Sequence, residues 1–125
     1  MKEEQEDLEI LSNELKGMEI SKPRGCVLTI GNKCKETEKN MFEWICFVEP
    51  NKQGLIEKII FQVNGNDFTV VESPFQITKQ SSDPCVVDIT VVWKENLNKD
   101  ASSFNYQLQF NRKESFSTHK IDFLK

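Results

Sequence analysis

The sequence predicts an all-β domain, an immunoglobulin-like antiparallel β-sandwich of seven to eight strands with an N-terminal α-helix in front of it. Three observations predict this class. From Cys26 onward, apolar and polar residues alternate with a period of two in short runs. Turn residues separate these runs about every 8 to 12 positions. No helical period recurs among them, and the Cys…Trp…Cys spacing of antibody domains does not occur in the sequence.

Residues 1–23 form the first segment, which we predict to be an amphipathic acidic helix followed by a short linker. Four apolar side chains recur every three or four positions and so share one stripe of a helix: Leu8, Leu11, Leu15 and Met18. Residues 1–19 hold seven acidic and two basic side chains, which gives this stretch a charge of −5. A helix of this kind must bury its stripe, either on its own sheet or on a partner chain. Both alternatives stay open.

The second segment, residues 24–125, supplies the strands. Expected strands cover residues 27–30, 42–48, 59–63, a piece ending at 70–75, then 86–93, 104–110 and 120–124. Residues 104–110 alternate almost perfectly between apolar and polar, as a half-exposed antiparallel strand does. The polar runs 33–40 and 96–103 are expected to be solvated loops.

Two polar loops, residues 64–68 and 80–84, flank the strands in the middle of the chain and are the candidate binding surface. Their candidate ligand-binding side chains are Asn64, Asn66, Asp67, Phe68, Ser81, Ser82 and Asp83, with Phe47 from a neighbouring strand. The carboxylates suit the ammonium or guanidinium group of a basic peptide. The same residue types are also good turn formers, so the loops could serve only to reverse the chain. Phe47 is equally a candidate for the core.

Composition excludes several classes of function. The net charge of −4 and the lack of a basic patch argue against direct nucleic-acid binding. No apolar run approaches the ~20 residues of a membrane span. The glycines are isolated, so no phosphate-binding loop and no cofactor is expected. The N-terminus has no signal-peptide pattern, which favours a reducing compartment.

The reactive residue types are too scattered to predict catalysis or metal binding. The four cysteines form no Cys-x-x-Cys pair, and the only histidine, His119, is far from them in sequence. We therefore expect free thiols and no zinc site. His119 lies in a Ser/Thr-rich stretch without a nucleophile at a strand-to-helix turn. The chain is not expected to be an enzyme.

A set of short motifs in a fixed order gives a more specific indication. They are Ile30-Gly31-Asn32, the Trp44-containing run 42–48, residues 55–63, the Ser73-Pro74-Phe75 element of 72–78, the run 86–93, and the closing pair 104–110 and 120–123. In this order they resemble the YEATS domain, a family of histone-tail readers, from about Arg24 to Leu124. The resemblance implies a β-sandwich that holds an acylated lysine between aromatic side chains in the two loops.

The chain departs from the family at those aromatic positions. The first loop is about four residues shorter and has Asn64 at the family's His position, and Ser81 and Ser82 stand where the second loop carries Gly and an aromatic. Of the slot walls, the resemblance leaves Phe47 and Phe68. A planar acyl group needs π faces on which to stack, so acyl-lysine binding is in doubt.

Three functions follow as hypotheses. The first is a nuclear, chromatin-associated subunit that binds a histone tail or another lysine-bearing peptide, acylated or not. The second is a non-reader scaffold of a nuclear acetyltransferase, remodelling or transcription complex, docked through the N-terminal stripe. The third is an adaptor with no histone connection, for which the two loops would lie at opposite ends of the sandwich.

Overall fold

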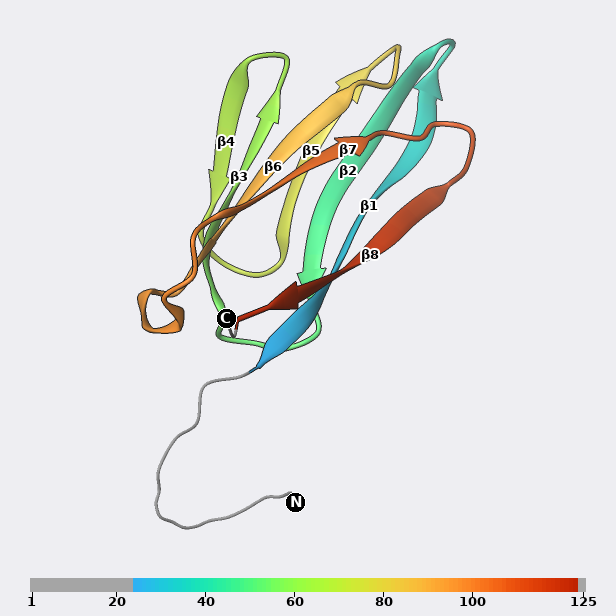
Figure 1. Ribbon diagram of the computed structural model, residues 1–125. Coiled ribbons are helices and arrows are strands. Elements are labelled where there is room, and N and C mark those ends of the chain that lie inside the picture. Colours follow the sequence, from blue (N-terminus) through green and yellow to red (C-terminus); the bar gives the residue numbers. More distant parts are fainter. Residues whose placement is uncertain (1–23, 124–125) are drawn as a thin grey trace.

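The computed structural model describes residues 24–123, which form two antiparallel four-stranded sheets packed face to face (Figure 1). One sheet has the order β5-β2-β1-β8 and the other the order β4-β3-β6-β7. The strands are β1 (Gly25–Glu38), β2 (Met41–Pro50), β3 (Ile56–Val63), β4 (Asn66–Val70), β5 (Phe75–Ser81), β6 (Val86–Trp93), β7 (Ser102–Gln107) and β8 (Glu114–Asp122). This is the predicted immunoglobulin-like sandwich, with eight strands. The predicted helix, with Leu8, Leu11, Leu15 and Met18, lies outside the described residues.

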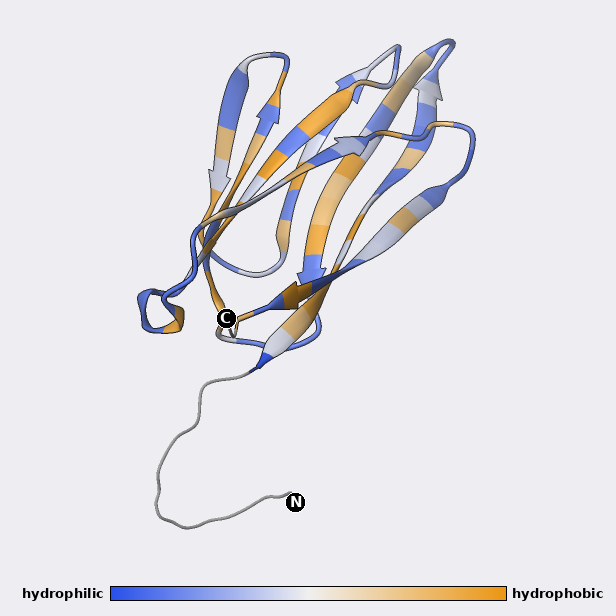
Figure 2. Cartoon of the chain, viewed as in Figure 1, coloured by the Kyte–Doolittle hydropathy of each residue, from blue (hydrophilic) through white to orange (hydrophobic). Residues whose placement is uncertain are grey.

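Strand alternation builds the core. Along β2, every second side chain from Trp44 to Val48 is buried, and β6 shows the same period. Figure 2 shows the resulting alternation of apolar and polar residues along the strands. The buried side chains of both sheets, among them Trp44, Phe61 and Ile89, meet in one cluster. Because each inward face is apolar, a shift of one residue in register would expose it, which fixes the pairing.

Several strands differ from those expected. The piece expected to end at 70–75 is β4, which ends at Val70, and a further strand, β5, runs from Phe75 to Ser81 where none was expected. β1 continues through Glu38, so most of the predicted loop 33–40 is a strand that turns at Lys39 and Asn40. β7 ends at Gln107, before Phe110, and β8 begins at Glu114. β1 beyond Cys34 is polar and exposed on both faces because the β1–β2 hairpin extends past the core. A polar strand of this kind shows no alternation to find.

One buried polar residue ties the connection after β7 to the core. Asn32 is fully buried, and its amide Nδ2 donates to the Gln109 carbonyl at 2.9 Å. Its Oδ1 accepts from the Gln109 amide and from the Tyr106 hydroxyl, each at 3.0 Å. These bonds use both acceptor positions of Oδ1 and one of the two Nδ2 donors, and they hold the chain at Gln109 against β1.

Candidate functional site at one end of the sandwich

The two predicted loops lie at the same end of the molecule. β3 and β5 both run toward this end, and β6, which follows the second loop, starts beside the end of β3 (Val63 pairs with Val87). Figure 1 shows the β3–β4 turn, the β5–β6 connection and the β1–β2 hairpin together at the top of the view. We call this the loop end. The arrangement expected for the adaptor hypothesis, with the loops at opposite ends, is not observed.

The first loop is shorter than the predicted 64–68. Only Asn64 and Gly65 form the hairpin turn, and residues 66–68 begin β4. Asn64 and Gly65 both have positive φ, 50° and 83°, as the two central residues of a type I′ turn require. After them, Asn66 is exposed, and the Asp67 carboxylate accepts a hydrogen bond from Gln62 Nε2 at 3.0 Å. Asn64 therefore shapes the turn, while Asn66 presents its side chain to solvent.

The second loop is anchored through Ser81. Its hydroxyl accepts a hydrogen bond from the indole Nε1 of Trp44 at 3.1 Å and donates to the Asp83 carbonyl at 2.9 Å. Ser81 thus positions the loop from the core outward. The side chains of Ser82 and Asp83 are exposed and form the part of this loop that a ligand can reach.

Phe68 is half-buried, and a lysine of the same chain already lies on its ring. The Lys79 Nζ lies 3.6 Å from the ring centroid, a close cation–π contact. Phe68 belongs to β4 and Lys79 to β5, which are edge strands of different sheets. No pattern in the sequence indicates this contact, because it depends on how the two sheets pack.

Phe47 lies apart from the loops, on the outer face of the β5-β2-β1-β8 sheet. It pairs with Gly31 on one side and with Gln76 on the other, whereas the loop end of β5 pairs with Phe42. A hollow of about 530 Å³ surrounds it, and the exposed Phe116 faces it across Gly31. Phe47 is therefore neither in the core nor beside the two loops.

Two aromatic residues that sequence reasoning did not select lie at the loop end. Phe42 and Phe110 stack with ring centroids 4.8 Å apart and planes inclined by 28°. Phe42 is the strand partner of Ser81. The sequence signal for these two residues was weak, since Phe42 only opens the run 42–48 and Phe110 only closes the run 104–110.

The thiols are unreactive in character. Cys26, Cys34, Cys46 and Cys85 are all free, and burial raises the pKa of Cys46 to about 12. Burial also raises the pKa of the other three thiols. The thiolate is the reactive form, so each is a poor nucleophile at neutral pH. No group of His, Cys, Asp and Glu suited to a metal ion occurs within residues 24–123.

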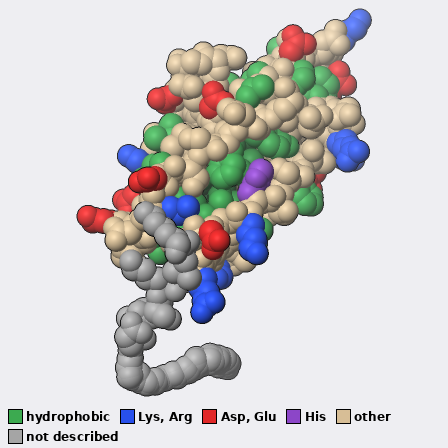
Figure 3. All heavy atoms as spheres, viewed as in Figure 1, with side chains coloured by type: hydrophobic (Ala, Val, Ile, Leu, Met, Phe, Trp, Pro, Cys, Tyr) green, Lys and Arg blue, Asp and Glu red, His purple; other side chains and the backbone are tan. Residues whose placement is uncertain are grey.

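His119 has a hydroxyl neighbour on its own strand. Ser117 Oγ lies 3.0 Å from His119 Nε2, because residues two apart on a strand share a face. The imidazole also lies against Phe104, with 5.0 Å between ring centroids, and Figure 3 shows the histidine among hydrophobic side chains. Within residues 24–123, no carboxylate forms a hydrogen bond with the imidazole of His119. The expectation that the chain is not an enzyme stays a prediction.

The part of the chain that the structure covers contains no helix long and apolar enough to cross a bilayer. Comparison with known proteins gives a match only at the level of structure. No protein-family model matches the chain. No curated protein sequence matches it either.

The solved structures that resemble the chain define its class as a YEATS-like fold. The crystal structure of the yeast AF-9 homolog protein Yaf9 superposes with a TM-score of 0.70 and 20% identity, over 79% of this chain and 78% of that one. The Yaf9 YEATS domain recognising an H3K122suc peptide superposes with a TM-score of 0.65 and 18% identity, over 85% of this chain and 90% of that one. The Yaf9 YEATS domain bound to H3K27ac superposes with a TM-score of 0.65 and 18% identity, over 84% of this chain and 87% of that one. The predicted fold is thereby confirmed.

Proposed function

We propose that this chain is a nuclear, chromatin-associated domain that binds a histone tail or another lysine-bearing peptide at the loop end and performs no chemistry on it. The observation that carries the proposal is the meeting of the 64–68 and 80–84 loops at one end of a YEATS-like fold. Yaf9 domains of this fold have been solved with acylated H3 peptides, which supports a peptide as the ligand.

The ligand groups come from three exposed side chains. Asn66, Ser82 and Asp83 present an amide, a hydroxyl and a carboxylate without being used in the turns themselves. A carboxylate on a loop pairs well with an ammonium or guanidinium group. Phe68 could stack on a ligand only after Lys79 moves away from it. Hydrogen bonding and charge therefore dominate this site over aromatic stacking.

The test is a titration of the full chain with H3-tail peptides whose lysine is unmodified or acetylated. Asp83→Asn should weaken binding of the unmodified peptide about tenfold, since a charge-assisted hydrogen bond is lost. The matched control is Asp100→Asn, an exposed aspartate outside both loops. No binding of either peptide at near-millimolar protein would remove the reader function.

The alternative is a scaffold subunit that does not bind histone tails. It is favoured by the number of loop groups already used within the chain: the Asn64-Gly65 turn, Asp67 with Gln62, and Ser81 with Trp44. Its docking element would be the stripe of Leu8, Leu11, Leu15 and Met18. Full chain carrying Leu11→Asp and Leu15→Asp should then lose its partners in co-purification, and undiminished recovery would exclude this docking element.

A further inference from the structure

A second hollow, also of about 530 Å³, opens at the loop end beside the candidate site. Its aromatic wall is the stacked pair of Phe42 and Phe110. The other wall is the connection between β7 and β8, residues 108–113, of which Asn111, Arg112 and Lys113 line the hollow. No residue of this hollow was selected from the sequence.

The connection is held in place along its length. Asn32 binds both the amide and the carbonyl of Gln109. The Cys34 thiol donates to the Arg112 carbonyl at 3.1 Å, and the Cys34 amide donates to the Lys113 carbonyl at 2.9 Å. A segment fixed at these points presents its side chains without a large ordering cost on binding.

The hollow adjoins the two loops directly. The Leu108 amide, where the connection begins, donates to the carbonyl of Cys85, which follows the second loop, at 3.0 Å. On the other side, Phe42 is the strand partner of Ser81. A peptide held by Ser82 and Asp83 would continue over Phe42 into the hollow within a few residues.

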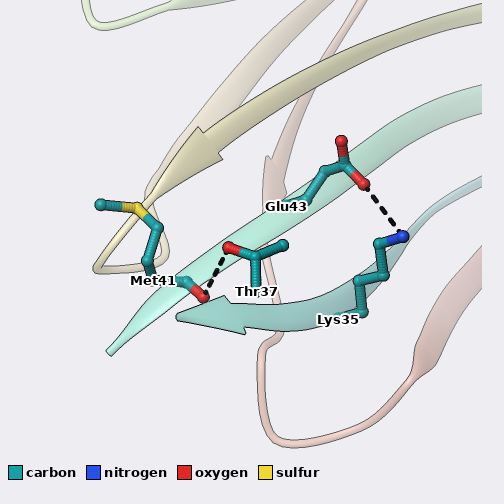
Figure 4. A network of polar contacts seen from close by, with 4 residues as sticks. All are labelled: Lys35, Thr37, Met41 and Glu43. Carbon is teal, nitrogen blue, oxygen red and sulfur yellow. Dashed lines mark hydrogen bonds and ion pairs between the residues drawn. The ribbon is translucent and has the colours of Figure 1, made fainter. Parts of the chain in front are cut away.

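The charges in the hollow are unbalanced. Of the four charged residues that line it, Lys35 is paired with Glu43 at 3.5 Å. Glu36 accepts a hydrogen bond from the Asn40 amide and keeps its negative charge, so the two cations Arg112 and Lys113 outnumber it. Figure 4 shows the Lys35–Glu43 pair beside the Thr37–Met41 hydrogen bond that closes the hairpin. Arg112 and Lys113 are exposed, and among residues 24–123 no ion pair is recorded for either.

We infer that the Phe42–Phe110 hollow is a second subsite, which binds an acidic flank of the peptide through Arg112 and Lys113. The inference rests on the proposed function and narrows it from a histone tail, which is basic, to a lysine-bearing peptide with Asp or Glu residues near its lysine. Two cations at the rim attract carboxylates and repel a basic flank. The aromatic pair between them packs against the aliphatic part of the peptide.

The experiment compares three peptides with the same central lysine and flanks of two Glu, two Gln or two Lys residues, titrated into the full chain by calorimetry. We expect the Glu-flanked peptide to bind about tenfold more tightly than the Gln-flanked one, and less so at high salt. Arg112→Gln with Lys113→Gln should abolish the difference while leaving the circular dichroism unchanged. The control, Arg24→Gln with Lys120→Gln, makes the same charge change at exposed residues remote from the loop end.

The outcomes separate the subsite from the proposed function. Equal affinity for the three flanks, or a preference unaffected by the Arg112 and Lys113 changes, overturns the subsite while the peptide function stands. If no lysine peptide binds, a tetraglutamate peptide is titrated alone and the backbone NMR shifts of Phe110 and Lys113 are followed. Shifts confined to the hollow support the subsite, and their absence overturns it. Tighter binding of an oligothymidylate of equal charge, sensitive to the same two residues, would identify a nucleic-acid site instead.

Discussion

Two aromatic features at the same end of the molecule differ in what surrounds them. At the first, Phe68 is covered by the ammonium group of Lys79 at 3.6 Å. At the second, Phe42 and Phe110 stack on each other and leave Arg112 and Lys113 at the rim. At Phe68, the cation Lys79 already contacts the ring of its own chain. At the Phe42–Phe110 pair, Arg112 and Lys113 remain exposed to a ligand. An aromatic residue near a loop therefore indicates a binding surface only when its neighbours leave it accessible.

The largest effect should come from removing the residue that holds the second feature in place. Asn32→Ala deletes three hydrogen bonds in a fully buried site and should lower the free energy of unfolding by about 3 kcal/mol. Urea unfolding measures this loss. Asn66→Ala, at an exposed position, should change the same quantity by less than about 0.5 kcal/mol. Similar losses for both variants would mean that Asn32 does not anchor the connection.

Burial of Cys46 in the core should make the free energy of unfolding fall as the pH rises into the alkaline range. The pKa of Cys46 is about 12 in the folded chain, above its usual value of 9.0, because burial disfavours the thiolate. The protonated Cys46 thiol therefore contributes to the free energy of unfolding. This contribution is complete below pH 9 and declines from there to about pH 12, because the thiol ionises first in the unfolded chain. At pH 10 the expected loss is on the order of 1–2 kcal/mol. Cys46→Val should reduce the slope of the free energy of unfolding against pH between pH 9 and 12, measured by urea unfolding. An unchanged slope would assign the pH dependence to other groups.

The smallest effect should come from uncovering Phe68. Lys79→Met keeps the aliphatic stem and removes the charge, so it should raise the affinity for an acetyl-lysine peptide about fivefold, which corresponds to about 1 kcal/mol. Lys58→Met, at another half-buried lysine, is the control. The ratio of acetylated to unmodified affinity is the measured quantity. If this ratio is the same in both variants, Phe68 takes no part in binding. The contrast between a covered Phe68 and an accessible Phe42–Phe110 pair would then not explain where a ligand binds.

Much of the sandwich could be predicted from single strands. The alternation around Trp44 and along 86–93 records which side chains face the core, and this information is local. The strand through Glu38 was missed because neither of its faces is buried there. The two loops do lie at one end of the sandwich, whereas Phe47 lies away from them. Asn64 and Ser81 shape the loops, a role that only φ angles and hydrogen-bond partners distinguish.

By itself, the sequence determined the fold class, most of the strands and the polar character of the two loops, because each depends on residue type and short-range period. It did not show β5, Phe75–Ser81. Only the tertiary structure decided which rings are accessible. The contact between Lys79 and Phe68 crosses two sheets, and the stack of Phe42 on Phe110 joins residues far apart in the chain. Such contacts depend on strand register and sheet packing, which are properties of the whole core and are not present in any one segment.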